Sequence, residues 1–319
     1  MVAMTDSPLI KGAMIAPAQA FTVHITITPK GGAGKTEVAN VLEAALSLSG
    51  HRPVLIDVDD GNRGLTRGIG KDHVVALNWA SGPTDAPDWV RRYASGDAPM
   101  IFDLGAGLMS ADLPILDFLS SVWRLLYNQG AKIVFHCIVS TNAPTSRFIG
   151  QILKDYGRIA EVLIVCNDQD RSASFPADIT GRENRQLKLD HLAPGLQAVR
   201  LLRKAPLSAL IAEPMQGYSI ATKMIAARVY RFACQLAAAS LLDPARLATL
   251  EAAAAGVPRL RYTIDQLADA TDDRIGRNAR LSKAHRRLVA ADLNPSGLLS
   301  AAEDYRLAHA AWVERISAM

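Results

Sequence analysis

The sequence predicts an α/β protein built on a mostly parallel, doubly wound sheet, with an all-helical extension at its C-terminal end. Short apolar and β-branched runs alternate with helical patterns through most of the 319 residues. This alternation is typical of a parallel sheet with helices on both faces. From residue 241 onward only helical patterns remain. We therefore expect a lead-in over residues 1–20, an α/β domain over 21–240 and a helical extension over 241–319.

The first half of the expected sheet begins with a strand at residues 21–28, where apolar and β-branched residues dominate. A helical pattern follows, from Glu37 to Ser49. The spacing of apolar residues then predicts, in order, a strand at 53–59, a loop rich in glycine and arginine at 60–71, a weaker strand at 74–79, a short helix near 89–94 and a strand at 100–103.

The second half continues the alternation with longer elements. The patterns predict a helix at 111–129, a buried strand at 132–140, a helix at 145–156 and a buried strand at 161–167. Residues 168–196 are polar and lack periodicity, so we expect a long surface loop or lobe there. A last strand is expected at 198–202, followed by a helical stretch to about residue 239.

The composition is that of an ordinary globular chain, with 49% hydrophobic and 21% charged residues. A net charge of +4 permits a nucleic-acid or anionic-membrane partner without requiring one. Cys137, Cys166 and Cys234 lie far apart, so we interpret them as small core residues of a reducing compartment. No apolar run is long enough to span a membrane, and residues 1–20 lack the apolar core of a signal peptide. We expect a cytoplasmic protein.

A glycine-rich loop, Pro29-Lys-Gly-Gly-Ala-Gly-Lys-Thr36, joins the first expected strand to the first helix. Glycines allow the backbone to turn tightly and to direct successive N–H groups at an anion, and the start of a helix adds its own N–H groups and positive dipole. In such a loop Lys35 would reach the β- and γ-phosphates of a nucleotide, and the Thr36 hydroxyl would hold Mg²⁺. The alternative is a glycine-rich loop with two solvated lysines. The expected nucleotide contacts in this stretch are Gly31, Gly32, Ala33, Gly34, Lys35, Thr36 and Glu37.

The loop departs from the general phosphate-binding pattern, because position 29 is proline and Lys30 adds a second lysine. The run Lys-Gly-Gly-Ala-Gly-Lys-Thr resembles the deviant Walker A motif of the ParA/MinD family of ATPases. The resemblance covers roughly residues 21–240 and implies ATP and Mg²⁺ as cofactors. It also implies an ATP-dependent homodimer in which Lys30 reaches the nucleotide of the partner subunit.

Two aspartates, Asp57 and Asp59, end the strand expected at 53–59. Parallel sheets bind ligands at the carboxyl ends of their strands, and alternation places both aspartates on one face. The pair is similar to the D-x-D run of the ParA/MinD family. That resemblance implies that Asp59 positions the attacking water and that Asp57 lies near Mg²⁺. The family usually continues with Pro-Gln, whereas this chain has Asp60-Gly61-Asn62. Two solvated turn carboxylates are the alternative.

A third carboxylate, Asp103, follows the strand at 100–103 and opens the run Asp-Leu-Gly-Ala-Gly. A carboxylate there can bind Mg²⁺ through water, as a Walker B aspartate does. The D-x-x-A-G spacing resembles the family motif, although Gly105 replaces the proline that commonly precedes Ala-Gly. A plain turn after a strand is the alternative. Asn167 ends the strand at 161–167, where these ATPases commonly carry an asparagine that binds the adenine edge; it could equally be an ordinary strand end or helix cap.

The resemblance implies an ATPase whose catalytic residues are Lys30, Lys35 and Asp59. We expect a switch in plasmid or chromosome partition or in conjugative DNA transfer, stimulated by an unidentified protein partner. The alternatives are a nucleotide-dependent scaffold that recruits a protein complex without DNA, and a metabolic enzyme that activates a small acid. Basic residues at helical spacing over 274–287 could bind DNA nonspecifically, or could form a solvated face paired with nearby aspartates.

Overall fold

The computed structural model describes the chain from Phe21 to Ala255 with several internal gaps. The described residues are 21–79, 83–94, 98–106, 108, 114–140, 146–169, 172, 175, 186–192, 194–201, 203–215 and 217–255. The expected lead-in at 1–20, most of the expected helical extension and the basic segment 274–287 therefore lie outside the described residues.

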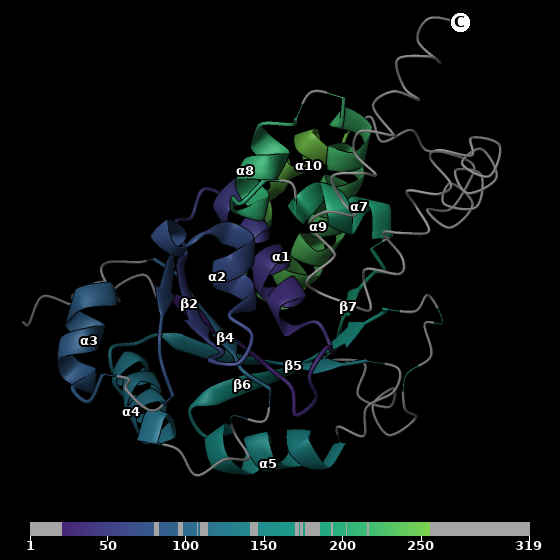
Figure 1. Ribbon diagram of the computed structural model, residues 1–319. Coiled ribbons are helices and arrows are strands. Elements are labelled where there is room, and N and C mark those ends of the chain that lie inside the picture. Colours follow the sequence, from purple (N-terminus) through teal and green to yellow (C-terminus); the bar gives the residue numbers. More distant parts are fainter. Residues whose placement is uncertain are drawn as a thin grey trace, which may run out of the picture.

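A seven-stranded sheet forms the centre of the molecule, with strand order β3-β2-β4-β1-β5-β6-β7 (Figure 1). Every neighbouring pair of strands is parallel. The strands are β1 (Thr22–Ile27), β2 (Val54–Val58), β3 (Val74–Ala76), β4 (Met100–Leu104), β5 (Lys132–Val139), β6 (Ala160–Asn167) and β7 (Gln186–Leu189). The predicted α/β class with a parallel, doubly wound sheet is confirmed.

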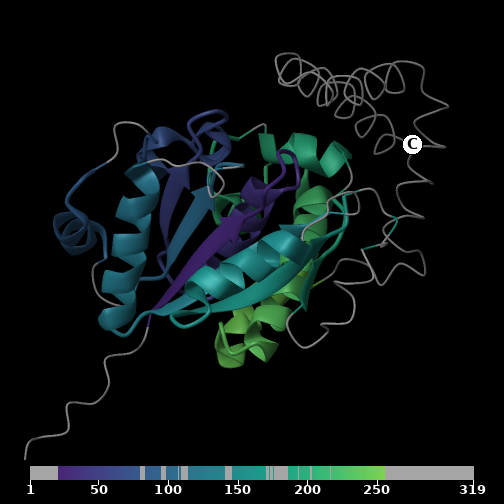
Figure 2. The same cartoon turned by 90° about the horizontal axis from the view of Figure 1, so that it is seen from below.

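Helices cover both faces of this sheet (Figures 1 and 2). The described helices are α1 (Lys35–Leu48), α2 (Gly64–Ile69), α3 (Ala86–Tyr93), α4 (Pro114–Asn128), α5 (Ser146–Tyr156), α7 (Pro194–Leu201), α8 (Leu207–Ala212), α9 (Ser219–Ala238) and α10 (Ala248–Ala254), with 3-10 turns at Lys71–His73 and Pro244–Leu247. Helices α1, α8, α9 and α10 bury apolar side chains against one face, and α3, α4 and α5 against the other.

The central strands are apolar on both faces, as a parallel sheet between two helical layers requires. Strand β5 illustrates this, since every residue from Ile133 to Val139 is buried. On the α4 side, aromatic side chains fill much of the core: the ring of Trp123 meets Phe102 and Phe135 edge-on, with centroids 6.2 and 5.3 Å away. The glycine-rich loop after residue 28 therefore leads from β1, the central strand of the sheet, into α1.

The prediction of a loop over residues 60–71 is wrong in part, because helix α2 occupies the centre of that range. The N–H and hydroxyl groups of Thr66 in the first turns of α2 donate to Oδ2 of Asp57, at 2.9 and 2.7 Å. Leu65 and Ile69 bury their side chains in the core on the α1 side. The helix is held by a carboxylate from another element, so the local glycine-rich sequence gave no signal for it.

The last strand of the sheet also differs from the prediction. Residues 198–201 are the end of α7, so the strand expected over 198–202 is wrong. The edge strand is β7, inside the segment expected to be a loop, and its Leu187 and Leu189 alternate with exposed or half-buried polar residues. A strand of four residues between polar segments carries too little periodicity to be recognised, whereas Pro194 is well suited to begin a helix.

The described part of the expected extension packs into the same core as the strands. Leu241, Leu242, Leu247 and Leu250 are buried with the residues of α1 and α9. Within the described residues, none of the helices combines the length and the apolar character needed to cross a bilayer.

All three cysteines are free thiols, with Cys137 and Cys166 buried and Cys234 half-buried. Burial raises the pKa of Cys137 to about 12 and, with some opposition from Lys188, that of Cys166 to about 11. Both buried thiols therefore stay protonated and behave as small apolar side chains.

Candidate nucleotide-binding site

The glycine-rich loop from Pro29 to Thr36, which we call the phosphate loop, joins β1 to α1 and contains two glycines in the left-handed conformation. Gly32 has φ 75° and Gly34 has φ 95°, conformations that side chains with a Cβ rarely adopt. Gly34 is the N-cap of α1, and the helix begins at Lys35. The first N–H groups of α1 have no partner within the helix, so they are available to an anion at this end. The backbone is therefore shaped as a phosphate cradle.

Two amide side chains at the end of β6 hold this loop from the side. Asn167 Nδ2 donates to the carbonyl of Ala33 at 3.0 Å, and Gln169 Nε2 donates to the carbonyl of Gly32 at 2.8 Å. A Cβ on Gly34 would lie 2.1 Å from Asn167 Nδ2, so only glycine allows this close approach. Asn167 thus contacts the phosphate loop itself, and its contact with an adenine edge stays a prediction.

Thr36 and Asp103 are brought together as the phosphate-loop pattern predicts. The Thr36 hydroxyl donates to Asp103 Oδ2 at 2.7 Å, and the Thr26 hydroxyl donates to Asp103 Oδ1 at 3.1 Å. Burial raises the pKa of Asp103 to about 7, and the charge of Asp57 acts in the same direction. The hydrogen bonds and the charge of Lys35 oppose that shift. A divalent cation beside Thr36 would supply the charge that this buried carboxylate lacks, so the residues present fit Mg²⁺.

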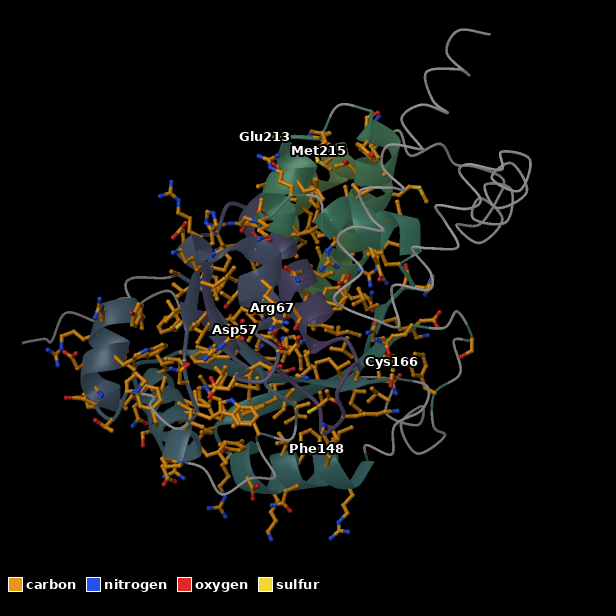
Figure 3. All side chains as sticks on the ribbon, viewed as in Figure 1. Asp57, Arg67, Phe148, Cys166, Glu213 and Met215 are labelled. Atoms are coloured by element: carbon orange, nitrogen blue, oxygen red, sulfur yellow. The ribbon has the colours of Figure 1, made fainter. Side chains whose placement is uncertain are left out.

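Asp57 is fully buried beside Asp103 on the neighbouring strand, near the centre of the molecule (Figure 3). Its Oδ1 accepts the N–H of Asp59 at 3.1 Å, while Oδ2 accepts the two donors of Thr66. These contacts engage both carboxylate oxygens of Asp57 and connect the end of β2 to the Asp59 turn and to α2. A role near Mg²⁺ stays a prediction.

Asp59 forms a turn directly after β2. Its Oδ1 accepts the N–H groups of Gly61 at 3.1 Å and Asn62 at 3.0 Å. The backbone N–H groups of Gly61 and Asn62 therefore orient the Asp59 carboxylate. The carboxylate is half-buried and has a second oxygen through which it could hold a water.

The two lysines of the loop have different environments. Lys35 is 6% exposed and its charge acts on Asp103, as expected for a residue that reaches into the site. Lys30 lies on the exposed part of the loop, where it could face a second molecule. Its role in a partner's site stays a prediction.

The side chain of Glu37 is engaged away from the phosphate loop. Its carboxylate pairs with Nη1 of Arg200 in α7 and, at 2.5 Å, with Nη1 of Arg228 in α9. Burial lowers the pKa of both guanidinium groups to about 10, so both remain charged at neutral pH. Any contact of residue 37 with a nucleotide would therefore come from its backbone N–H, and that contact stays a prediction.

Sequence reasoning missed two residues that organise the Asp59 turn. Arg63 has the left-handed φ of 48°, and its Nη1 donates to the carbonyls of Asp57 at 3.2 Å and Leu77 at 2.9 Å. Trp79 donates its indole N–H to the carbonyl of Val58 at 2.8 Å. Their function depends on contacts between distant segments, and no short motif signals such contacts.

Comparisons with known proteins give a distant structural similarity. No family model and no curated protein matches the sequence. Among solved structures, the MinC:MinD cell division protein complex of Aquifex aeolicus matches with 15% identity and a TM-score of 0.44, covering 68% of this chain and 96% of the other. A similarity this distant does not bear on activity, ligand or partner, so the geometry of the site must carry any functional conclusion.

Proposed function

We propose that this protein is a ParA/MinD-type ATPase that binds Mg²⁺ and ATP, dimerises around the nucleotide and hydrolyses it. The observation that carries the proposal is the hydrogen bond between Thr36 and Asp103, directly beneath a glycine-rich loop with two lysines. A hydroxyl, a buried carboxylate and a cationic side chain meet there at the N-terminus of α1, which is the set of groups that a metal–triphosphate requires.

Nucleotide binding in this proposal uses mostly backbone groups. The N–H groups of the phosphate loop and of the first turn of α1 bind the phosphates, and Lys35 neutralises charge on the β- and γ-phosphates. Thr36 and Asp103 would hold Mg²⁺, while Asp57 fixes the Asp59 turn and α2. Bound Mg²⁺ supplies charge neutralisation of the phosphates.

Hydrolysis in this proposal places a water in line with the γ-phosphate. Asp59 orients that water, and the water oxygen bonds to phosphorus as the bond from phosphorus to the β,γ-bridging oxygen breaks. ADP leaves with the bridging oxygen, and the proton of the water goes to the released phosphate. Lys35, and Lys30 from the partner subunit, stabilise the charge that spreads over the transferred group. Because the two subunits share the nucleotide, its hydrolysis would also allow the two subunits to separate.

The cargo we favour is DNA, in partition or conjugative transfer, with contact through the basic segment 274–287. Phosphate contacts depend strongly on salt, because each one releases bound counterions. Co-sedimentation with DNA, with and without ATP and across a salt series, tests this assignment. Salt-sensitive binding that requires ATP supports it, whereas absence of binding favours a scaffold that recruits proteins alone.

Lys30→Ala tests the core of the proposal. We expect Mg²⁺–ATP binding, measured by calorimetry, to change less than about threefold, because the N–H groups and Lys35 remain. Hydrolysis should fall by about 10³-fold, as when a charge donated in trans is removed. Full ATPase activity in this variant would contradict the shared site, and a wild-type protein that binds no ATP would contradict the whole proposal.

A further inference from the structure

Trp79 lies where two loops of the candidate site meet. Its indole N–H donates to the carbonyl of Val58, which also accepts the N–H of Gly105 at 3.0 Å. Its own backbone N–H donates to Asp60 Oδ2 at 2.5 Å. One side chain is therefore bonded to the end of β2 while its backbone is bonded to the turn that contains Asp59.

The indole also occupies the space beside Gly105. A Cβ at position 105 would lie 2.4 Å from Trp79 Cζ2, a distance that no side chain can tolerate without displacing the ring. The same Cβ would lie 3.3 Å from both Cα and Oδ1 of Asp59. Three segments of the chain thus meet at one point: the Asp59 turn, the segment after Asp103 and Trp79.

This arrangement accounts for glycine at position 105, where similar motifs carry proline. A proline ring would fill the space that the indole takes. Arg63 adds a second connection between the same segments, because it donates to the carbonyls of Asp57 and Leu77 and contacts the side chains of Asp60 and Asn78. Both Arg63 and Trp79 therefore connect the Asp59 turn to the segment at residues 77–79.

We propose that Trp79 is a positioning residue for Asp59. It couples Asp103, which would hold the metal, to Asp59, which would orient the water. Gly105 is two residues from Asp103, so a shift of Asp103 towards a bound cation moves the segment on which the indole rests. Trp79 transmits that shift to the Asp59 turn through direct packing and through the shared carbonyl of Val58. This inference deepens the proposed ATPase function and rests on it.

Two substitutions of Trp79 separate its contributions. Trp79→Ala removes both the packing on Gly105 and the hydrogen bond, and we expect kcat to fall on the order of 10²-fold, as for a misplaced catalytic group. Trp79→Phe keeps a ring over Gly105 but loses the N–H donor, and we expect a loss of about fivefold, the size of one neutral hydrogen bond. In both variants the dissociation constant for Mg²⁺–ATP should change less than about threefold, because no group in the phosphate cradle is altered.

Trp89→Phe is the matched control. Trp89 is a buried tryptophan of α3 that packs among Tyr93, Phe102 and Phe118, and its indole nitrogen has no hydrogen-bond partner among the described residues. We expect wild-type kcat and wild-type ATP affinity in this variant. We also expect the tryptophan fluorescence to change on adding Mg²⁺–ATP, because Trp79 lies beside the site. This change should persist in Trp89→Phe and disappear in Trp79→Phe.

Gly105→Ala gives an independent test through a double-mutant cycle. Alone, it should lower kcat on the order of 10²-fold because the new methyl displaces the indole. In the Trp79→Ala background the ring is absent and only the 3.3 Å approach of the new methyl to Asp59 remains, so the added loss should be well below that of Gly105→Ala alone. Additive losses would overturn the proposed contact.

The inference is overturned if Trp79→Phe and Trp79→Ala hydrolyse ATP at the wild-type rate. It is also overturned if their ATP affinity falls as much as their kcat, since that result indicates a purely structural role. In both cases a wild-type protein that hydrolyses ATP leaves the proposed function standing. A wild-type protein that binds no ATP overturns both.

Discussion

At the scale of single residues, the candidate site is built around a carboxylate in an unfavourable position. Asp103 is 1% exposed, and burial together with the nearby Asp57 raises its pKa to about 7. Without a cation the ionised form is destabilising, because two hydroxyl donors and Lys35 offset only part of the desolvation. The ionised form of Asp103 is therefore unfavourable in the metal-free protein and would be stabilised by a bound cation.

Asp103→Asn should therefore stabilise the nucleotide-free protein above neutral pH. The folded-state pKa is higher than the unfolded value of 3.8, so the wild type loses stability as pH rises from about 4 through 7. We expect the melting temperature of the variant to exceed that of the wild type by more at pH 8 than at pH 5. Thermal unfolding at both values tests this, with the exposed Asp88→Asn as control. An equal difference at the two pH values would contradict the assigned shift.

At the scale of elements, a buried histidine pair joins β1 to β5. His24 Nδ1 and His136 Nε2 lie 2.9 Å apart and neither side chain is exposed. Burial lowers the pKa of His136 to about 3. The pKa of His24 is lowered well below its usual value, mainly by burial and to a smaller extent by the nearby His136. Both histidines are therefore neutral in the folded protein at physiological pH.

Acid should destabilise the protein through this pair. The unfolded chain binds protons at these histidines below about pH 6.5 while the folded chain does not, so stability falls as pH decreases from 6.5 towards 3. Asp103 has the opposite dependence in part of that range, so the comparison must be between variants. We expect His24→Leu/His136→Leu to have a smaller loss of stability than the wild type between pH 7 and pH 5 in urea unfolding. An unchanged pH dependence would contradict this account.

The ion cluster around Glu37 joins α1 to α7 and α9. Glu37→Gln leaves Arg200 and Arg228, whose side chains are 18% and 5% exposed, without the carboxylate that pairs with both. We expect a loss of about 3 kcal/mol in the free energy of unfolding. The matched control is Glu213→Gln, whose carboxylate pairs with Arg203 but is 75% exposed. We expect a change within about 0.5 kcal/mol there. Similar values for the two variants in urea unfolding would contradict the prediction.

At the scale of the whole molecule, much of the sheet could be predicted from the sequence because apolar and β-branched residues dominate each long strand. Strand β5 and helix α4 match their expected ranges within a few residues, since burial on both faces or on one helical stripe leaves a strong pattern. Helix α2 and strand β7 could not be predicted, because one is held by Asp57 from another strand and the other has four residues at the sheet edge.

Part of the candidate site could likewise be predicted from the sequence, and part could not. The loop at Lys30–Thr36 and Asp59 follow strands, and Asp57 and Asp103 are the next-to-last residues of theirs, so the order of the motifs predicts that they lie at one edge of the sheet. The contacts of Trp79 could not, because they depend on how the segment after β3 folds back onto Gly105 and Val58.

In the proposed function, two copies of the chain share ATP across the exposed side of the phosphate loop. Sedimentation velocity of the protein with Mg²⁺ and a nonhydrolysable ATP analogue measures whether such a dimer forms. We predict dimers with the analogue, monomers with ADP, and monomers with the analogue in Lys30→Ala. Wild-type protein that stays monomeric while saturated with the analogue would contradict the account.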